Sequence, residues 1–153
     1  MRGKIAFAAA GVMVAACGSS PAASVSSSPT PTTQAVVAVE VKTVKGQTEL
    51  VLVNASAQTL YYLTSDTSTT VACSGQCATF WPPLLLAAGD PSSASSLPGK
   101  LSVLADANGR QVLYNGHPLY AFVKDKASSD ANGEGVNAFG GTWHAATPTL
   151  AAI

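Results

Sequence analysis

Apart from Cys17 near the start of the chain, two cysteines and two histidines could bind a soft metal ion, and the two cysteines could take part in a redox reaction. Cys73 and Cys77 are close together, with Ser, Gly and Gln between them, whereas His117 and His144 lie far downstream. In a protein exported from the cytoplasm, a close cysteine pair usually forms a disulfide, and this spacing allows the bridge to close within a turn. The sequence therefore predicts a disulfide between Cys73 and Cys77. The alternative is a metal or redox site in which the two sulfurs and the two imidazoles act together.

A group of oxygen-bearing side chains lies at Asp130, Asn132 and Glu134. This alternate spacing, followed by Gly135, resembles the first half of an EF-hand calcium loop. The twelfth position of such a loop should hold a bidentate Glu, but here it is Gly141, and no helical pattern flanks the segment. Asp, Asn and Gly are also common turn residues. We expect a structured loop and no resident cofactor, with calcium binding as the alternative.

None of the common catalytic motifs occurs in the chain. It lacks a Gly-x-Ser-x-Gly nucleophile elbow, a His-Glu-x-x-His zinc motif and a Walker phosphate loop. Asp66 and Asp125 stand at corresponding places in the two halves, as the paired carboxylates of aspartic proteases do. The residues after them do not complete the Asp-Thr/Ser-Gly pattern of those enzymes. The sequence predicts a protein that is not an enzyme.

The segment 1–16 has the pattern of an export signal. A basic start at Arg2 and Lys4 precedes an apolar run at positions 5–16. This run is too short to span a bilayer, because a spanning helix needs about 20 residues. The tetrapeptide VAAC, which ends at Cys17, has the shape of a bacterial lipobox. The resemblance implies that the segment 1–16 is removed and that Cys17 carries a lipid anchor, which would hold the protein on the extracytoplasmic face of the cell membrane.

The segment 17–35 joins this anchor to the rest of the chain. After Cys17 it consists almost entirely of Ser, Pro, Thr and Ala, and it contains no charged side chain. Such a segment cannot bury enough apolar surface to offset its ordering entropy, so we expect a tether. Removal of the signal leaves six basic side chains against eight acidic ones, a net charge of about −2, which argues against a nucleic-acid partner. The expected partners are the membrane, through the anchor, and a protein or small molecule of unknown identity.

The segment 36–153 carries the signals of an all-β domain. β-branched and alternating apolar residues predict strands. The predicted strands cover positions 36–44, 49–53 and 60–63 in the first half and positions 101–105, 111–114 and 119–123 in the second. Asn115-Gly116 predicts a tight hairpin, because a type I′ turn needs positive φ at both positions. A short helical turn is expected at positions 76–81, where Pro82 and Pro83 would stop it.

The two halves repeat one another at a constant offset of 59. The stretch TLYYLTSD, which ends at Asp66, is echoed by PLYAFVKD, which ends at Asp125, and the offset extends to Phe80 and Phe139. One three-strand meander cannot bury its apolar face alone, so two copies should pack together. The predicted fold is a single all-β domain, 36–153, of two repeated antiparallel meanders at about 36–84 and 101–148. We expect them to pack as a sandwich or open barrel with little helix.

These segments resemble a family of bacterial secreted and lipoprotein repeats marked by Tyr-x-(Phe/Trp/Tyr)-x-x-Asp. YAFVKD, at positions 120–125, matches fully, whereas YYLTSD, at positions 61–66, departs from the pattern at Leu63. The stretches CSGQC with the following WPPL, NGHPLY and NAFGGTW also resemble patterns of this family. The resemblance implies an envelope location and a repeated unit, and it brings no established activity.

We interpret the repeated motif as a folding device. Its residues here are Tyr61, Asp66, Tyr120, Phe122 and Asp125. Tyr120 and Phe122 share one face of a strand because side chains alternate. Each Asp follows its Tyr by five residues, where the strand gives way to a loop and a carboxylate can accept backbone N–H bonds. The expected function is that of a non-catalytic cell-envelope lipoprotein with a binding or structural role, and the alternative is a small accessory protein that uses the metal, redox or calcium residues described above.

Overall fold

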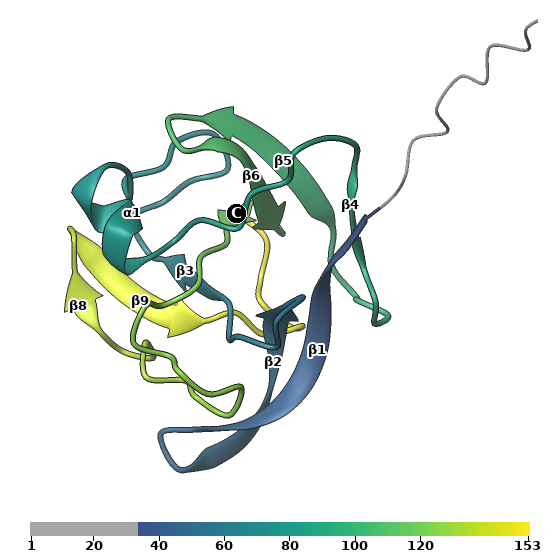
Figure 1. Cartoon of the computed structure of the whole chain (residues 1–153), viewed down its shortest axis with the longest axis vertical. Helices are drawn as coiled ribbons and strands as arrows, with labels where there is room; N and C mark the ends of the chain where they lie inside the picture. Colours follow the sequence, from purple (N-terminus) through teal and green to yellow (C-terminus); the bar gives the residue numbers. More distant parts are fainter. Residues whose placement is uncertain (1–33) are drawn as a thin grey trace, which may run out of the picture.

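The computed structural model describes residues 34–153, and Figure 1 shows them as three three-stranded sheets wrapped around a common interior. The predicted signal peptide, Cys17 and nearly all of the tether lie outside the described residues. Within positions 34–153 the one helix is α1 (Gln76–Phe80), and the rest of the regular structure is β-strand. This confirms the predicted all-β, sandwich-like fold with little helix. No helix in this part of the chain is long and apolar enough to cross a membrane.

The first sheet is built on a long hairpin of β1 (Gln34–Val44) and β2 (Gln47–Asn54). The strands pair in register from Val37 opposite Asn54 to Val44 opposite Gln47. The turn between them, Lys45-Gly46, has positive φ at both residues, as a tight hairpin requires. β4 (Pro91–Ser93) adds to the other side of β1 in parallel. Because β4 pairs with Gln34 and Ala35, β1 begins two residues earlier than predicted, inside the segment that we had assigned to the tether.

The second sheet contains β5 (Leu101–Asp106), β6 (Gly109–Tyr114) and β7 (His117–Pro118) in a meander. The predicted Asn115-Gly116 hairpin is confirmed, with φ values of 50° and 88°. The strand predicted at positions 119–123 is wrong, since β7 ends at Pro118 and only Tyr120 makes isolated bridges beyond it. The reason is tertiary: after β7 the backbone pairs with the other half of the molecule, and a turn begins at Phe122, whose carbonyl accepts from Asp125 N.

The third sheet joins the two halves. β3 (Tyr61–Leu63) pairs with β9 (Gly141–Ala145), and β8 (Asn137–Ala138) completes the sheet as a hairpin with β9. β3 therefore pairs with a segment near the end of the chain and does not continue the first meander. An isolated bridge between Val53 and Thr59 connects the segment just before β3 to β2. The strands β4, β8 and β9 were not predicted from the sequence.

The backbone hydrogen bonds show that the two halves are related by pseudo-twofold symmetry. The molecule contains two rings of three backbone hydrogen bonds, in which three residues from separate segments donate to one another. Each ring takes two residues from one half and the third from the other half. The ring of the first half runs from Leu60 N to Leu52 O, from Leu52 N to Ala146 O and from Ala146 N to Leu60 O, at 2.8, 2.7 and 2.8 Å. The ring of the second half runs from Leu119 N to Val112 O, from Val112 N to Leu84 O and from Leu84 N to Leu119 O, at 3.0, 2.8 and 2.9 Å.

The predicted extension of the offset of 59 to Phe80 and Phe139 is wrong. Leu60 and Leu119 correspond at an offset of 59, as predicted, but Leu84 and Ala146 correspond at an offset of 62. The bond from Val123 N to Phe80 O matches that from Thr64 N to Thr142 O, so Phe80 corresponds to Thr142. The loop of the second half that precedes β9 is therefore three residues longer than its counterpart.

The interior contains two clusters of buried side chains. The first lies where the motif segments meet and includes Tyr61, Leu63, Cys73, Trp81, Tyr120, Phe122 and Trp143. The second lies between the β1–β2 and β5–β6 hairpins and includes Val37, Leu52, Leu60, Val112, Tyr114 and Leu119. Each half contributes to both clusters, so neither half could bury its apolar surface alone.

Candidate functional site

The two motif tyrosines cross over between the halves. The hydroxyl of Tyr61 donates to Oδ2 of Asp125, and the hydroxyl of Tyr120 donates to Oδ2 of Asp66, both at 2.7 Å. Between them the backbones of Tyr61 and Tyr120 exchange two hydrogen bonds, with N to O distances of 2.8 and 2.9 Å. All four side chains are buried. Each copy of the motif is thus completed by the other copy.

The second oxygen of each carboxylate binds the backbone of its own loop. Oδ1 of Asp66 accepts from Ala72 N at 2.7 Å, and Oδ1 of Asp125 accepts from Asn132 N at 3.0 Å. Backbone donors were expected, but these lie six and seven residues ahead instead of within a local turn. The tyrosine hydroxyls were missed as partners, since nothing in the sequence shows which segments the fold brings together.

Burial controls the ionisation of this group. It raises the pKa of Tyr61 and of Tyr120 far above the ordinary value of a phenol, and the neighbouring carboxylates add to the shift. Burial also raises the pKa of Asp66, against the lowering effect of the bonds it accepts from Ala72 N and Tyr120. Because both carboxylates accept bonds from protein donors with both oxygens, these residues form an internal brace between the two halves.

Two stacked tryptophans lie beside this brace. The rings of Trp81 and Trp143 are 3.8 Å apart and almost parallel, at 2°. Each also meets a motif tyrosine edge to face, Trp81 with Tyr61 at 5.5 Å and Trp143 with Tyr120 at 5.1 Å. Phe122 stacks on Trp81 at 4.1 Å. Such aromatic pairs add about 0.5–1.5 kcal/mol each beyond the burial of their area, so this stack fixes the halves against one another.

The structure confirms the predicted disulfide between Cys73 and Cys77. Both cysteines are buried in the first cluster, and Cys77 belongs to α1 whereas Cys73 precedes it. With the sulfurs bonded to each other, no thiolate of this pair is free to bind a metal ion with His117 and His144. The four residues of the metal alternative therefore do not form a site in this structure.

His117 and His144 both lie close to Tyr62. The ring of Tyr62 is 4.7 Å from that of His117 and 5.8 Å from that of His144. His117 Nε2 contacts the carbonyl oxygen of Ala151 at 3.0 Å, and His144 Nδ1 contacts Oε1 of Glu134 at 2.8 Å. Each histidine is thus held as a structural side chain next to Tyr62.

The oxygen side chains of the expected loop at Asp130, Asn132 and Glu134 do not converge on one point. Oδ2 of Asp130 accepts from the backbone N–H groups of Lys126 and Ala127, which lower the pKa of Asp130. Oε2 of Glu134 accepts from Ala145 N at 2.7 Å. The segment is a structured loop, as expected. Within positions 34–153 no group of three or more His, Cys, Asp or Glu side chains is placed to hold a metal ion.

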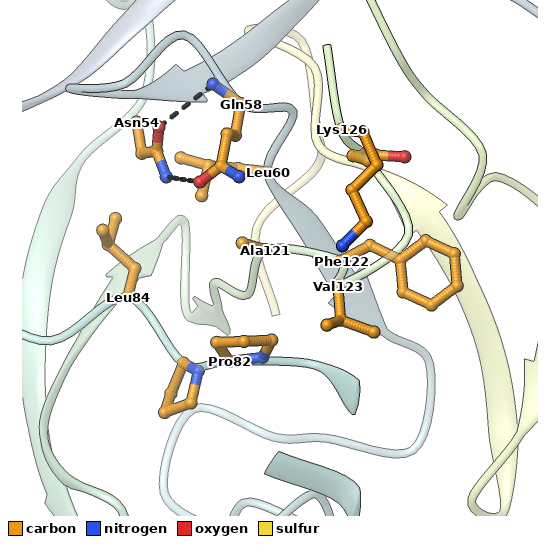
Figure 2. A pocket seen from close by; sticks show the side chains of 11 residues that line it. Asn54, Gln58, Leu60, Pro82, Leu84, Ala121, Phe122, Val123 and Lys126 are labelled. Atoms are coloured by element: carbon orange, nitrogen blue, oxygen red, sulfur yellow. Dashed lines mark hydrogen bonds between the residues drawn. The ribbon is translucent and has the colours of Figure 1, made fainter. Parts of the chain in front are cut away.

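A surface pocket of about 450 Å³ opens beside the motif of the second half. Figure 2 shows its walls, where the first half contributes Gln58 and the second half contributes Ala121 and Lys126. The remaining lining residues are Asn54, Leu60, Pro82, Pro83, Leu84, Phe122, Val123 and Asp125. We call this cavity the junction pocket, because segments from both halves form it.

Two nitrogen groups at the junction pocket are free to bind a ligand. Oε1 of Gln58 accepts from Asn54 Nδ2 at 3.0 Å, which leaves the Gln58 Nε2 donors without a partner in the described chain. The ammonium of Lys126 makes no salt bridge within positions 34–153, and its side chain extends toward Ala121 in Figure 2. The pocket thus combines an apolar floor with two donor groups, a common composition for a small-molecule site.

Comparison with protein families supports the resemblance inferred from the sequence. The segment 102–147 matches the Lipoprotein_15 family, a secreted repeat of unknown function. This match lies in the second half of the chain and covers less than half of its length. Neither the curated proteins nor the solved structures gave a match to the chain.

The secreted repeat supports an extracytoplasmic location for this module. By the pseudo-twofold symmetry, the first half has the same architecture although the family match covers the second half. The motif residues were found from the sequence and turned out to be internal, whereas Gln58 and Ala121 were missed as pocket residues. The signal that could have found them was the comparison of the two copies, which differ at these two positions.

Proposed function

We propose that this protein is a non-catalytic, lipid-anchored module of the cell envelope that binds a ligand in the junction pocket. The observation that carries the proposal is the crossed pairing of Tyr61 with Asp125 and of Tyr120 with Asp66. The residues that define the repeat are buried and bonded to each other, so the repeat itself provides a scaffold. Binding then depends on surface positions that the scaffold holds in place.

The proposal of a lipid anchor rests on the lipobox that ends at Cys17 and on the polar segment after it. From its composition we expect the segment 18–33 to behave as a flexible coil, which would reach roughly 22 Å, enough to hold the domain off a membrane surface. The secreted nature of the matching family fits this location.

The proposal of a non-catalytic role is supported by the state of the reactive groups. Catalytic carboxylates and histidines need a reactive atom directed at a substrate. Here Asp66 and Asp125 accept bonds with both oxygens, all from donors of the protein itself. The cysteines Cys73 and Cys77 are joined to each other.

The junction pocket is favoured as the binding surface because both halves form it. Gln58, Leu60 and Pro82 come from the first half, and Ala121 and Val123 come from the second. The crossed tyrosines fix these segments relative to one another, and a rigid support lowers the entropy lost on binding.

Expression of the full chain in a bacterial host tests the anchor. We expect the membrane fraction to contain a form that starts at Cys17 and carries acyl mass, and Cys17→Ser to abolish both processing and acylation. A mature form that starts elsewhere and lacks acyl mass would contradict the proposal. Protease added to cells with an opened outer layer should digest the domain, as expected for the extracytoplasmic face.

A further inference from the structure

We propose that the junction pocket binds a single flat aromatic ring that carries a hydroxyl or carboxylate group, an inference that rests on the binding role proposed above. The ligand class follows from the symmetry of the molecule. At the corresponding place in the other half, the protein fills the same space with a ring of its own.

The correspondence of the two places is set by backbone bonds. Ala121 N donates to Pro82 O at 2.8 Å, and the matching positions in the other half, Tyr62 and His144, are paired in the β3–β9 ladder. The offset of 59 that relates Leu60 to Leu119 also relates Gln58 to His117. The same set of three side-chain positions is thus present twice in the molecule. It consists of Tyr62, His117 and His144 in one copy, and of Ala121, Gln58 and Pro82 in the other.

In the first copy the space is occupied. The half-buried ring of Tyr62 lies close to two imidazoles, with its centroid 4.7 Å from that of His117 and 5.8 Å from that of His144, and both rings are tilted against it. Tyr62 also borders a neighbouring surface pocket, together with Glu134 and Lys45. The first copy thus already holds a phenol ring next to two imidazoles at this place in the fold.

In the second copy the ring is missing and its neighbours remain flat. The methyl group of Ala121 replaces the phenol, while the amide of Gln58 and the ring of Pro82 replace the two imidazoles. The result is the open volume of about 450 Å³ that Figure 2 shows between these residues. A ring supplied from outside would restore the contacts with two neighbouring side chains that Tyr62 makes in the first copy.

The polar side chains that line the junction pocket indicate which substituent the ring of the ligand should carry. The ammonium of Lys126 has no salt-bridge partner in the described chain, and the Nε2 donors of Gln58 lack an acceptor there, so an acceptor on the ligand would satisfy them. Asp125 also lines the pocket, but both of its oxygens already accept bonds, from Tyr61 and from Asn132 N. A phenol or an aromatic carboxylate fits this arrangement.

The test is a titration of the isotope-labelled domain, released from its anchor but otherwise complete, with two probes followed by NMR. One probe is 4-hydroxyphenylacetate, a free aromatic acid, and the other is N-acetyltyrosinamide, an uncharged mimic of a tyrosine side chain in a polypeptide. We expect saturable shifts of the backbone amides of Gln58, Ala121 and Val123. Tighter binding of the acid would support a small-molecule ligand, and tighter binding of the amide would support a polypeptide ligand.

Variants make the test specific. Ala121→Tyr should fill the pocket with an internal ring and weaken either probe by about tenfold or more. Ala107→Tyr, which adds the same ring at a surface turn position, should bind like the parent. Lys126→Ala should weaken the acid by about two- to fivefold and leave the uncharged amide unchanged. If Ala121→Tyr fails to fold, Ala121→Leu fills part of the same space and should also weaken binding.

The proposal is overturned if neither probe gives saturable shifts at the junction pocket, or if the folded Ala121→Tyr or Ala121→Leu protein binds them as the parent does. A failure of this proposal can be distinguished from a failure of the proposed function. An acylated, envelope-located protein that binds neither probe would contradict the ring ligand alone, whereas an unacylated protein that binds them would contradict the anchor alone.

Discussion

The hydroxyl of Tyr61 donates to Oδ2 of Asp125, 64 residues further along the chain and in the other copy of the motif. The bond from Tyr120 to Asp66 repeats this relationship in the opposite direction. Within one copy, Tyr and Asp share no side-chain hydrogen bond in the described chain, although they lie five residues apart. The repeat therefore functions as half of an internal pair, and its defining residues hold the two halves together.

This relationship predicts which pairs of residues are energetically coupled. Tyr120→Phe leaves an oxygen of the buried Asp66 without its donor, so it should lower the free energy of unfolding by about 1.5–3 kcal/mol, the range for a hydrogen bond to a charged group. In a double-mutant cycle with Asp66→Asn, the coupling energy should be about 0.5–3 kcal/mol. Urea denaturation measures each free energy.

The matched control for this cycle is the pair within one motif. Tyr120 and Asp125 share no hydrogen bond in the structure, so the effects of Tyr120→Phe and Asp125→Asn should add within about 0.5 kcal/mol. Stronger coupling of Tyr120 to Asp125 than to Asp66 would show that the motif closes on itself and would refute the crossed arrangement.

The tyrosines also predict an alkaline limit to stability. Burial raises the pKa of Tyr61 and Tyr120 in the folded protein far above the value of about 10 for the unfolded chain. The folded state thus binds these protons more tightly. The contribution of these tyrosines to the free energy of unfolding is complete below a pH of about 10. It is lost as the pH rises above this value, by about 1.4 kcal/mol per pH unit for each tyrosine that is still protonated in the folded protein.

The measurement is phenolate absorbance followed together with circular dichroism. Tyr61 and Tyr120 should ionise only as the protein unfolds, and the double Phe variant should lose the steep alkaline dependence. Ionisation of all four tyrosines near the ordinary phenol pKa in a protein that stays folded would contradict this prediction.

Leu63 stands where the complete motif has an aromatic ring, and the structure predicts that a ring cannot be accommodated there. Leu63 is fully buried, and a Cβ placed on Gly141 would lie 2.8 Å from its Cδ1. Leu63→Phe should therefore lower stability by about 1–3 kcal/mol through overpacking. The melting temperature in thermal denaturation tests this prediction. A Leu63→Phe variant that melts at or above the temperature of the parent would show that the core has space for the ring.

Reduction of the disulfide should destabilise the protein moderately. The bridge between Cys73 and Cys77 closes a small loop, which corresponds to about 1–3 kcal/mol in the chain-entropy description. Because both cysteines are buried, a thiol label should react only after reduction and opening of the loop. Cys73→Ser combined with Cys77→Ser gives the same comparison without a reductant, and free thiols in the untreated domain would refute the bridge.

Local chemistry was sufficient to predict the elements near tight turns. The Asn115-Gly116 turn has the positive φ values that its residues favour, and the alternation at positions 36–44 predicted β1 except for its first two residues. The close cysteine pair predicted the disulfide. These features depend on residues near one another in sequence, which is why they could be predicted without the fold.

The sequence alone determined the all-β class, the duplication and the resemblance to a secreted repeat. Only the tertiary structure decided that β3 pairs with β9, that the motif tyrosines bond to the aspartates of the opposite copy, and that the offset changes from 59 to 62 before β9. The physical reason is that the burial of the Trp81 and Trp143 stack selects one arrangement of segments far apart in the chain. Replacement of Tyr62 by Ala121 looks like an ordinary difference between two repeats, and it becomes a pocket only when the halves are brought together.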